Sequence, residues 1–364
     1  MTAYLQAFDC HTGLGSADET LQGLLAGRVA LELQSVSAEP GGEQVPLALR
    51  QPTRKVTPPR WWADLLSLLA SIPENDWGSA RRPVIISSSN FGIDHLYQIG
   101  TGLGPGDRAR NWATTHGIVA QLQRHFNWGD ALHVVSHACV SAQIALCLAS
   151  EWIETGSVEE VLIVSFDYVG PFVSCGFNSL KILNSGMPAP YRDQEVGSIG
   201  LGDGAAWATF SKRQAPWKLE ATSLWNEMYQ FTANDPSGEG FDAVLQPLSE
   251  ILSQRKFWVK GHGTGTLEAG RLEAGAVARL FPDKPLVGWK GSLGHSLGSC
   301  ALVELVLALN GHAEGRVPGT VGSSAPFFSE AVCADPVDVR SMDSVLLLCN
   351  AFGGAHGALL ISHA

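Results

Sequence analysis

Short apolar stretches typical of buried strands alternate with segments of helical periodicity along most of this chain. Parallel strands need a long crossover connection, which a helix usually supplies, so the alternation predicts a mostly parallel sheet with helices on its faces. The expected strands are residues 3–8, 83–87, 131–135, 161–166, 205–210, 218–222, 257–260, 285–289, 345–350 and 358–362. The first expected helix has its N-cap at Ser16 or Asp18 and ends at Gly27. The other expected helices are residues 61–72, 112–126, 144–153, 175–184, 240–254, 274–280 and 302–310.

The order of elements repeats after a polar stretch at residues 211–217. We therefore expect an internal duplication, with a first half over residues 1–214 and a second, similar half over residues 215–364. Residues 36–60 are rich in proline, glycine and polar side chains, so an irregular loop is expected there. The Gly-x-Gly pairs at Gly102 and Gly104 and at Gly200 and Gly202 do not open a strand–helix unit with an acidic residue at the expected offset, and no nucleotide cofactor is expected.

The composition is that of a compact globular protein, with 45% hydrophobic and only 16% charged residues among 364. A net charge of -11 argues against nucleic acid as a partner, because phosphate binding needs basic patches. No apolar run approaches the ~20 residues that span a membrane, and the first residues lack the features of a signal peptide. The seven cysteines are scattered without CxxC spacing, which favours reduced thiols in a cytoplasmic protein over disulfides or a zinc site.

Residues 136–143 (Ser-His-Ala-Cys-Val-Ser-Ala-Gln) join an expected strand to an expected helix through a turn of small residues. The turn puts Cys139 at a helix N-terminus, where unpaired N–H groups and the helix dipole favour negative charge. A cysteine in this position is expected to have a lowered pKa, and its thiolate is the reactive form. The stretch therefore predicts that Cys139 is a nucleophile.

Two histidines lie in glycine-rich loops that follow expected strands of the second half. They are His262, within residues 261–266 (Gly-His-Gly-Thr-Gly-Thr), and His295, within residues 294–298 (Gly-His-Ser-Leu-Gly). Such loops form the carboxyl edge of a parallel sheet, where ligands bind. A lone loop histidine more often has a structural or solvated role than a catalytic one. Two of them, together with a cysteine at a strand-to-helix turn, favour a site in which histidines activate a thiol.

These segments resemble the β-ketoacyl-acyl carrier protein synthases, and specifically their stand-alone (type II) members. Residues 262–266 are similar to the first histidine motif of that family, and Lys290 with His295 five residues later is similar to the second. The Cys139 turn is similar to the nucleophile segment, and residues 350–353 are similar to the C-terminal glycine-rich loop. The resemblance covers nearly the whole chain. It implies a thiolase-like fold, a five-layered α/β/α/β/α arrangement of two similar halves.

The resemblance also implies an acyltransferase that performs a decarboxylative Claisen condensation without a metal or cofactor. Cys139 would accept an acyl group from a carrier-protein thioester, and a malonyl thioester would then lose carbon dioxide and attack the acyl-cysteine. His262 and His295 would donate hydrogen bonds to the malonyl thioester carbonyl as it becomes an enolate. The resemblance also implies that Lys290 and Glu304 are a supporting pair that orders the pocket. The oxyanion hole would be formed by the backbone N–H of Cys139 and by a gating loop at Phe352, Gly353 and Gly354.

The partners implied are an acyl carrier protein, with its phosphopantetheine-borne acyl and malonyl groups, and a second ketosynthase-like chain in a homodimer or a heterodimer with a paralogue. The strand and loop at residues 83–95 are the expected contact between the two chains. The last glycine-rich loop is shorter than the family pattern, and Gly270 stands where the family usually has an aspartate. These departures favour a polyketide or polyene pathway over housekeeping fatty acid synthesis.

Two other functions stay open. Ser296 lies in a G-x-S-x-G motif and would be the nucleophile of a hydrolase or acyltransferase, with Asp335 or Asp338 and His356. The residues before this motif form a poor strand, which disfavours a nucleophile elbow. The chain could also be a non-catalytic subunit, similar to a chain length factor, in a ketosynthase heterodimer. Such subunits typically lose the cysteine, so the presence of Cys139 favours an active enzyme.

Overall fold

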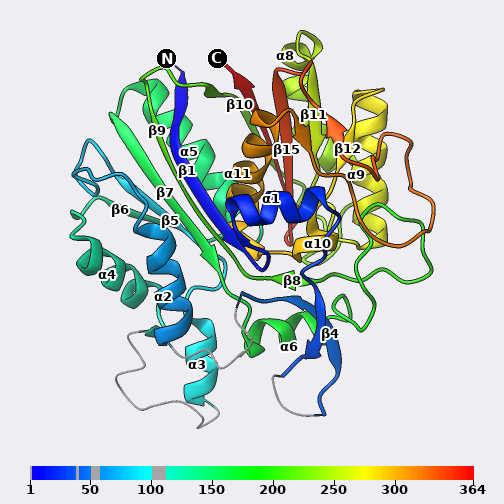
Figure 1. Cartoon of the computed structure of the whole chain (residues 1–364), viewed down its shortest axis with the longest axis horizontal. Coiled ribbons are helices and arrows are strands. Elements are labelled where there is room, and N and C mark those ends of the chain that lie inside the picture. The colour runs from blue at the N-terminus through cyan, green and yellow to red at the C-terminus, as the bar shows by residue number, and fades with distance from the viewer. Residues whose placement is uncertain (1, 38–40, 51–57, 101–111) are drawn as a thin grey trace.

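The computed structural model describes residues 2–37, 41–50, 58–100 and 112–364. Its centre is a mixed sheet in which five strands come from each half of the chain (Figure 1). The strands of the first half are β1 (Ala3–Thr12), β5 (Val84–Ser87), β6 (Leu132–Val135), β7 (Glu160–Asp167) and β9 (Gly204–Ser211). Those of the second half are β10 (Trp217–Asn226), β11 (Phe257–Lys260), β12 (Leu286–Val287), β15 (Ser344–Ala351) and β16 (Ala355–His363).

The strand order of the first half recurs in the second. It is β1-β9-β7-β5-β6 in one and β10-β16-β15-β11-β12 in the other. In each half the two pairs farthest from the centre are parallel and the two nearest pairs are antiparallel. The halves meet where β1 runs antiparallel to β10, with Ala3 opposite Leu219. The repeated order supports a division into residues 1–214 and 215–364, which we retain as a proposal.

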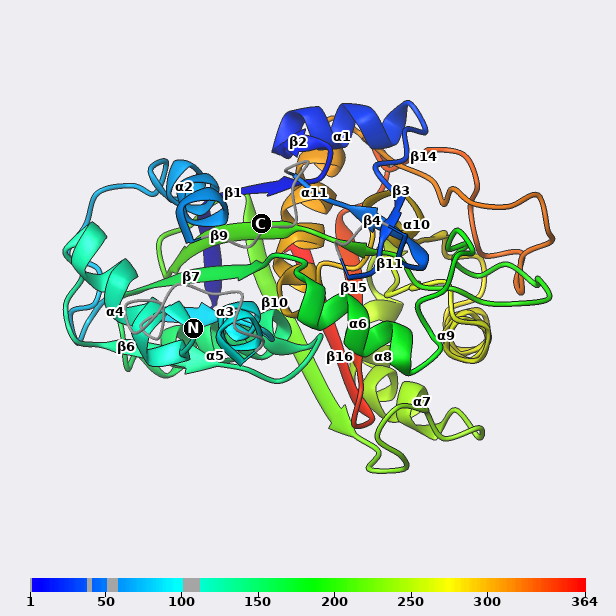
Figure 2. The same ribbon diagram turned by 90° about the horizontal axis from the view of Figure 1, so that it is seen from below.

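Helices complete a five-layered arrangement. Two of them, α5 (Ser141–Thr155) and α11 (Cys300–Ala313), pack together between the two halves of the sheet (Figure 2). The outer face of the first half is covered by α2 (Pro58–Leu69) and α4 (Thr115–Phe126). The outer face of the second half is covered by α7 (Glu239–Leu245), α8 (Ser249–Ser253) and α9 (Leu267–Leu280). Three apolar cores, one central and two outer, thus separate the five layers.

The central helix α11 is buried on every side because sheets or helices contact it all round. Leu302, Leu305 and Leu309 are fully buried, as expected for a helix that is apolar around its whole circumference. Glu304 interrupts this apolar surface and is only 3% exposed. A carboxylate at such a position needs partners of opposite charge, and it therefore marks a functional or structural site within the core. None of the helices in the described part of the chain is long and apolar enough to cross a membrane.

Most predicted elements are present, but the prediction of an irregular loop at residues 36–60 was wrong in part. β3 (Glu32–Ser35) pairs with β4 (Gln44–Ala48), and β4 pairs with β8 (Leu201–Gly202), so that a small sheet forms beside the large one. Its strands are held by burial of Val45 and Leu47 against Leu201, a contact that local composition does not reveal. Residues 38–40 and 51–57 of the expected loop lie outside the described residues.

Other differences have local causes. Pro247 divides the helix expected at 240–254 into α7, a 3-10 turn (Gln246–Leu248) and α8, because proline lacks the N–H that a continuous helix requires. Pro171 starts α6 (Pro171–Ser179) four residues before the predicted start, since proline suits the first turn of a helix. The strand expected at 285–289 is shortened to β12 because α10 (Lys290–Leu293) follows directly. The remaining short elements are β2 (Gly15–Ser16), α1 (Ala17–Leu25), α3 (Ile93–Gly100), a 3-10 turn (Leu297–Ser299), β13 (Arg316–Val317) and β14 (Val337–Asp338).

The expected contact between chains at residues 83–95 does not lie at an exposed edge. β5 is hydrogen-bonded to β6 on one side and β7 on the other, and Val84, Ile85 and Ile86 are fully buried. The last strand of the first half is β6, where His133 and Val134 are exposed. An edge strand leaves backbone groups unpaired and is the part of a sheet that can pair with another chain.

Candidate active site

Cys139 lies in the tight turn between β6 and α5. Ala138 has a φ of 44°, in the left-handed region that non-glycine residues seldom adopt. The Ser141 hydroxyl holds this turn closed, because it accepts a hydrogen bond from the His137 N–H (2.8 Å) and donates one to the Ala138 carbonyl (2.7 Å). The turn presents Cys139 at the wall of a cavity of about 300 Å³. The helix itself begins at Ser141, so Cys139 lies just before its N-terminus.

Both predicted histidines lie beside Cys139 at the same cavity. His295 Nε2 is 2.9 Å from Cys139 Sγ, within hydrogen-bond distance. The rings of His262 and His295 meet edge to face, with centroids 5.0 Å apart. All three side chains line the cavity, together with residues 350–354. The structure thus brings together one nucleophile candidate from the first half of the chain and two histidines from the second.

The expectation that Cys139 has a lowered pKa was wrong. Burial raises the pKa of this thiol well above its usual range, and the neighbouring Cys300 sulfur adds to the effect, whereas Lys290 acts in the opposite direction. The position before α5 does not outweigh this desolvation, because the helix dipole acts mainly on groups at the first turn. The resting thiol is therefore protonated, and it becomes nucleophilic only when a neighbour accepts its proton. His295 is in position to do so.

His262 is a neutral imidazole at ordinary pH. Burial lowers the pKa of His262 well below its usual range, and the positive charge of Lys290 lowers it further. Among the described residues, the Nδ1 atoms of His262 and His295 have no hydrogen-bond partner. A neutral imidazole can still donate one N–H, so His262 can stabilise a developing oxyanion without being protonated.

Glu273 of α9 holds the loop that carries His262. Its carboxylate accepts hydrogen bonds from the backbone N–H groups of His262 (2.7 Å) and Gly263 (3.0 Å) and from the Tyr191 hydroxyl (2.7 Å). The glycines of this loop are required by close packing, since a Cβ at Gly261 would overlap the Tyr191 hydroxyl. The backbone around His262 is therefore fixed by a buried carboxylate and a buried phenol.

A second set of buried polar groups continues from Glu273. Asn350 Nδ2 donates to Glu273 Oε1 (3.3 Å), and Asn350 Oδ1 lies 3.1 Å from His356 Nδ1. His356 Nε2 in turn lies 3.1 Å from Glu227 Oε2. Because the Asn350 amide donates to Glu273, its oxygen must accept, and this makes His356 Nδ1 the donor. The chain of contacts connects the His262 loop to the segment that follows β10.

Lys290 and Glu304 form the predicted pair, and a second lysine joins them. Lys290 Nζ lies 2.8 and 2.9 Å from the two Glu304 oxygens, and Lys260 Nζ lies 2.9 Å from Glu304 Oε2. Burial opposes the charge of Lys290, but Glu304 and the neighbouring sulfurs of Cys300 and Cys349 together outweigh burial and raise the pKa of Lys290 above its usual range. For Lys260 burial dominates and lowers the pKa. The cluster therefore keeps a protonated lysine beneath the cysteine and histidines.

Asp167 holds the loop that carries His295. Its carboxylate accepts hydrogen bonds from the Gly298 N–H (2.7 Å), the Ser88 hydroxyl (2.7 Å) and the Ser89 N–H (3.0 Å). Burial raises the pKa of Asp167 to about 6, although these hydrogen bonds act against the shift. The loop after β5 and the loop after His295 are thus joined through one buried carboxyl group.

The C-terminal glycine-rich loop borders the cavity as expected. Phe352, Gly353 and Gly354 all line it, and the Phe352 ring stacks on Phe177 with centroids 5.6 Å apart. The Gly353 N–H donates to the Phe231 carbonyl (2.7 Å). In this conformation that N–H is already bonded, so Gly353 does not offer it to an oxyanion.

The structure contradicts the alternative in which Ser296 is the nucleophile. The residues before it form the helix α10, whereas a nucleophile elbow requires a strand. The proposed partners are also engaged elsewhere: Asp338 binds the Arg340 guanidinium on the surface, and His356 lies between Glu227 and Asn350. These residues do not form a serine–histidine–aspartate triad.

The sequence reasoning missed several residues of the site. They contact the two histidine loops, the Cys139 carbonyl or the buried polar groups beside them, and most of them have no local sequence pattern. Lys260 had a usable signal, since it directly precedes the glycine-rich stretch at residues 261–266. The residues missed are Asp167, Tyr191, Glu227, Lys260, Cys300 and Cys349.

Comparison with solved structures identifies the class of fold. Over its full length the chain superposes on a chain of the ketosynthase and chain length factor complex from Xenorhabdus doucetiae (TM-score 0.79, 18% identity, 98% of that chain). It also superposes on a chain of a type II polyketide synthase ketosynthase bound to its acyl-carrier protein (TM-score 0.83, 14% identity, 99% of that chain). The protein therefore has the thiolase-like fold of the ketosynthases, as predicted.

Sequence comparison finds similarity to a known family in the second half of the chain. Residues 226–324 match the C-terminal domain of β-ketoacyl synthases. A 3-oxoacyl-[acyl-carrier-protein] synthase 2 of Coxiella burnetii is 26% identical over 209 residues, which cover 51% of this chain and 50% of that protein. The chain spans 50–60% of the length of the first curated relatives it matches. The predicted resemblance to the β-ketoacyl-acyl carrier protein synthases is confirmed.

Proposed function

We propose that the chain is a β-ketoacyl-acyl carrier protein synthase that condenses an acyl-cysteine with a malonyl thioester. The observation that carries the proposal is the contact of 2.9 Å between Cys139 Sγ and His295 Nε2 at a cavity that His262 also lines. A thiol with a base beside it is the arrangement required for covalent catalysis.

The first stage loads the enzyme. As Cys139 Sγ attacks the carbonyl carbon of an acyl thioester, its proton moves to His295 Nε2. The tetrahedral intermediate then expels the carrier thiolate, which takes up a proton as the acyl-cysteine forms. Because burial holds the pKa of the Cys139 thiol high, attack and proton transfer must be coupled, and the distance between Cys139 and His295 permits this.

The second stage forms the carbon–carbon bond. The bond from malonyl C2 to the carboxylate breaks, carbon dioxide leaves, and the electron pair passes into the thioester as an enolate. N–H groups of His262 and His295 would donate to the enolate oxygen. The enolate carbon attacks the acyl-cysteine carbonyl, the C–S bond breaks, and the sulfur takes up a proton. The protonated Lys290 beneath the site favours every state in which negative charge develops.

The substrates would be borne by the phosphopantetheine of an acyl carrier protein, and the chain would work with a second ketosynthase-like chain, either a copy of itself or a paralogue. Two observations support this. Solved structures with the same fold include a ketosynthase with its chain length factor and one with an acyl-carrier protein. The edge strand β6 also leaves Val134 exposed. The shortened glycine-rich loop favours a polyketide or polyene pathway over fatty acid synthesis.

One observation favours a second candidate, a non-catalytic subunit similar to a chain length factor. The N–H of Gly353, expected to serve an oxyanion hole, donates instead to the Phe231 carbonyl. The two candidates differ in what Cys139 does. A catalytic chain forms a thioester at this residue, whereas a structural subunit does not.

The test is transfer of an acyl group from acyl carrier protein to the purified chain, alone and with a co-expressed paralogue, followed by intact mass and peptide mapping. The wild type should gain one acyl group, mapped to Cys139, and the Cys139→Ala variant should gain none. Cys147→Ala is the matched control, because Cys147 lies on the neighbouring helix α5 and is partly exposed. Absence of an adduct on the wild type under both conditions would favour the structural subunit.

A further inference from the structure

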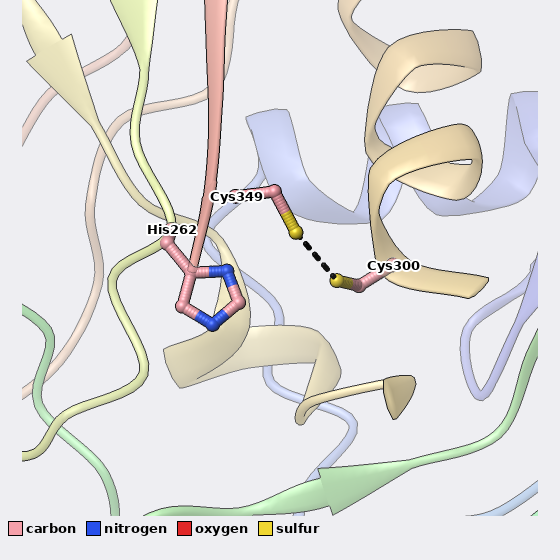
Figure 3. Close-up of side chains that lie close together, drawn as sticks. All are labelled: His262, Cys300 and Cys349. Carbon is pink, nitrogen blue, oxygen red and sulfur yellow. Dashed lines mark hydrogen bonds between the residues drawn. The ribbon is translucent and has the colours of Figure 1, made fainter. Parts of the chain in front are cut away.

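A cluster of two thiols and one imidazole lies behind the candidate active site. Cys300 is the first residue of α11, Cys349 lies on β15, and His262 lies on the loop after β11 (Figure 3). The sulfur of each cysteine and one ring nitrogen of the histidine lie within 4.8 Å of one another. Cys300 and Cys349 are 1% exposed and His262 is 6% exposed, so the cluster is shielded from water.

The spacing of the two sulfurs suits a soft metal ion. Cys300 Sγ and Cys349 Sγ are 3.7 Å apart, and both cysteines are free. Two sulfurs bound to zinc at about 2.3 Å in a tetrahedral site lie about 3.8 Å apart. The sulfurs therefore need almost no movement to become ligands, and imidazole is a frequent third ligand in such sites.

Alternation along β15 explains how this cluster stays separate from the polar groups around Glu273. Successive side chains of a strand point to opposite faces, so Cys349 faces α11 while Asn350 faces α9. Cys300 and Glu304 share one face of α11, since they are four residues apart. The thiols thus come from two rigid elements of the core, which is the kind of support that holds metal ligands in place.

We propose that Cys300, Cys349 and His262 form a binding site for one thiophilic divalent ion of the zinc class. The expectation that the cysteines hold no zinc site rested on the absence of CxxC spacing. That spacing identifies ligands that are close in sequence, whereas these three residues are brought together from three elements.

Binding of the ion would release protons and change the site beside it. Zn²⁺ binds both sulfurs as thiolates and each sulfur that carries a proton releases it, so the ion's charge is balanced by its two ligands. Both thiols now lie within hydrogen-bond distance of the Cys139 carbonyl, Cys349 Sγ at 3.1 Å and Cys300 Sγ at 3.5 Å. These S–H donors would be lost, and His262 would be withdrawn from the cavity. If the proposed function holds, the ion is a reversible inhibitor of condensation.

The binding test uses Co²⁺ as a spectroscopic probe and needs no substrate. Reduced, metal-free protein titrated with Co²⁺ should develop a thiolate-to-cobalt charge-transfer band that saturates at one ion per chain, and Zn²⁺ should abolish it. Cys300→Ala and Cys349→Ala should each weaken binding by about tenfold or more, since outer-sphere changes alone reach that size. Cys333→Ala is the control, because Cys333 lies outside the cluster.

A second measurement covers the case in which a core variant fails to fold. Zn²⁺ added to wild-type protein should protect two cysteines from alkylation in mild denaturant, and peptide mapping should identify them as Cys300 and Cys349. Three results would overturn the proposed site: absence of the charge-transfer band, a band that persists in both variants, or protection of other cysteines. Acyl loading and condensation measured along the same titration test the inhibition separately: turnover should fall as the band rises, and unchanged turnover would overturn that consequence alone.

Discussion

At the scale of single residues, the two histidines occupy different positions relative to the sulfur. His295 touches Cys139 Sγ, whereas His262 meets the His295 ring. We therefore expect His295→Ala to slow alkylation of Cys139 by iodoacetamide near neutral pH by about 10²-fold, the lower range for loss of a positioned base. His262→Ala should leave this rate within a few fold of the wild type, because it removes no contact of the sulfur.

The matched control for this comparison is His137→Ala. His137 is exposed and lies two residues from Cys139, so it tests whether any imidazole near the sulfur has the same effect. Alkylation rates are measured by peptide mass at a series of times. Equal rates for the wild type and His295→Ala would exclude His295 as the group that accepts the thiol proton.

At the scale of elements, α11 depends on one buried carboxylate. Glu304 of this helix is the shared partner of Lys260 and Lys290, both at most 1% exposed. Glu304→Gln would leave a buried positive charge without its counter-ion. Removing one member of a buried ion pair typically costs about 3–5 kcal/mol. We expect urea unfolding to show a loss of that size in the free energy of unfolding.

Glu314→Gln is the control for this prediction. Glu314 is the C-cap of the same helix, is exposed, and accepts hydrogen bonds from Gln22. Its substitution should change stability by no more than about 0.5 kcal/mol, as surface changes usually do. An unfolding midpoint for Glu304→Gln equal to that of the wild type would mean that both lysines are neutral in the folded protein.

Elements with a strong apolar period could be predicted from the sequence, and elements held by distant contacts could not. β11 was predicted at its observed bounds because residues 257–260 are all buried between β12 and β15. β4 was missed because Val45 and Leu47 become buried only against Leu201, far along the chain. β3 was missed because its Leu33 stays exposed and the strand is defined by its pairing with β4. In both cases glycine and proline positions indicate where a strand can begin or end. They fix the bounds of the strand only when the neighbouring element is known.

At the scale of the whole molecule, the candidate site lies where the two halves meet. Cys139 comes from the first half, and His262, His295 and Lys290 come from the second. Motif reasoning found these four because each lies in a local pattern with chemical meaning. It could not find Asp167 or Glu227, since a buried carboxylate has no sequence signature until its partners, here residues of distant loops, are known.

The same dependence on distant partners gives a prediction about pH. Asp203 lies before β9 and joins two other segments, since its carboxylate accepts the Val169 N–H (2.7 Å) and the Arg50 N–H (3.0 Å). Burial raises the pKa of Asp203 from 3.8 to about 7, although these hydrogen bonds oppose the shift. A carboxyl group with a raised folded-state pKa stabilises the fold fully below its unfolded pKa. That stabilisation is lost as the pH rises through the folded pKa.

Asp203→Asn cannot titrate, so its difference from the wild type isolates this contribution. The variant also loses one of the two acceptor oxygens and should be less stable at every pH. The stability advantage of the wild type should be largest near pH 5 and should narrow as the pH rises to about 8, because ionised Asp203 is the less favourable buried form.

Urea unfolding of both proteins across this pH range measures the difference in their free energies of unfolding, with the exposed Asp18→Asn as the control. A difference that stays constant with pH would mean that Asp203 is already ionised at pH 5. Asp167, with its pKa of about 6, is present in both proteins and cancels from the comparison.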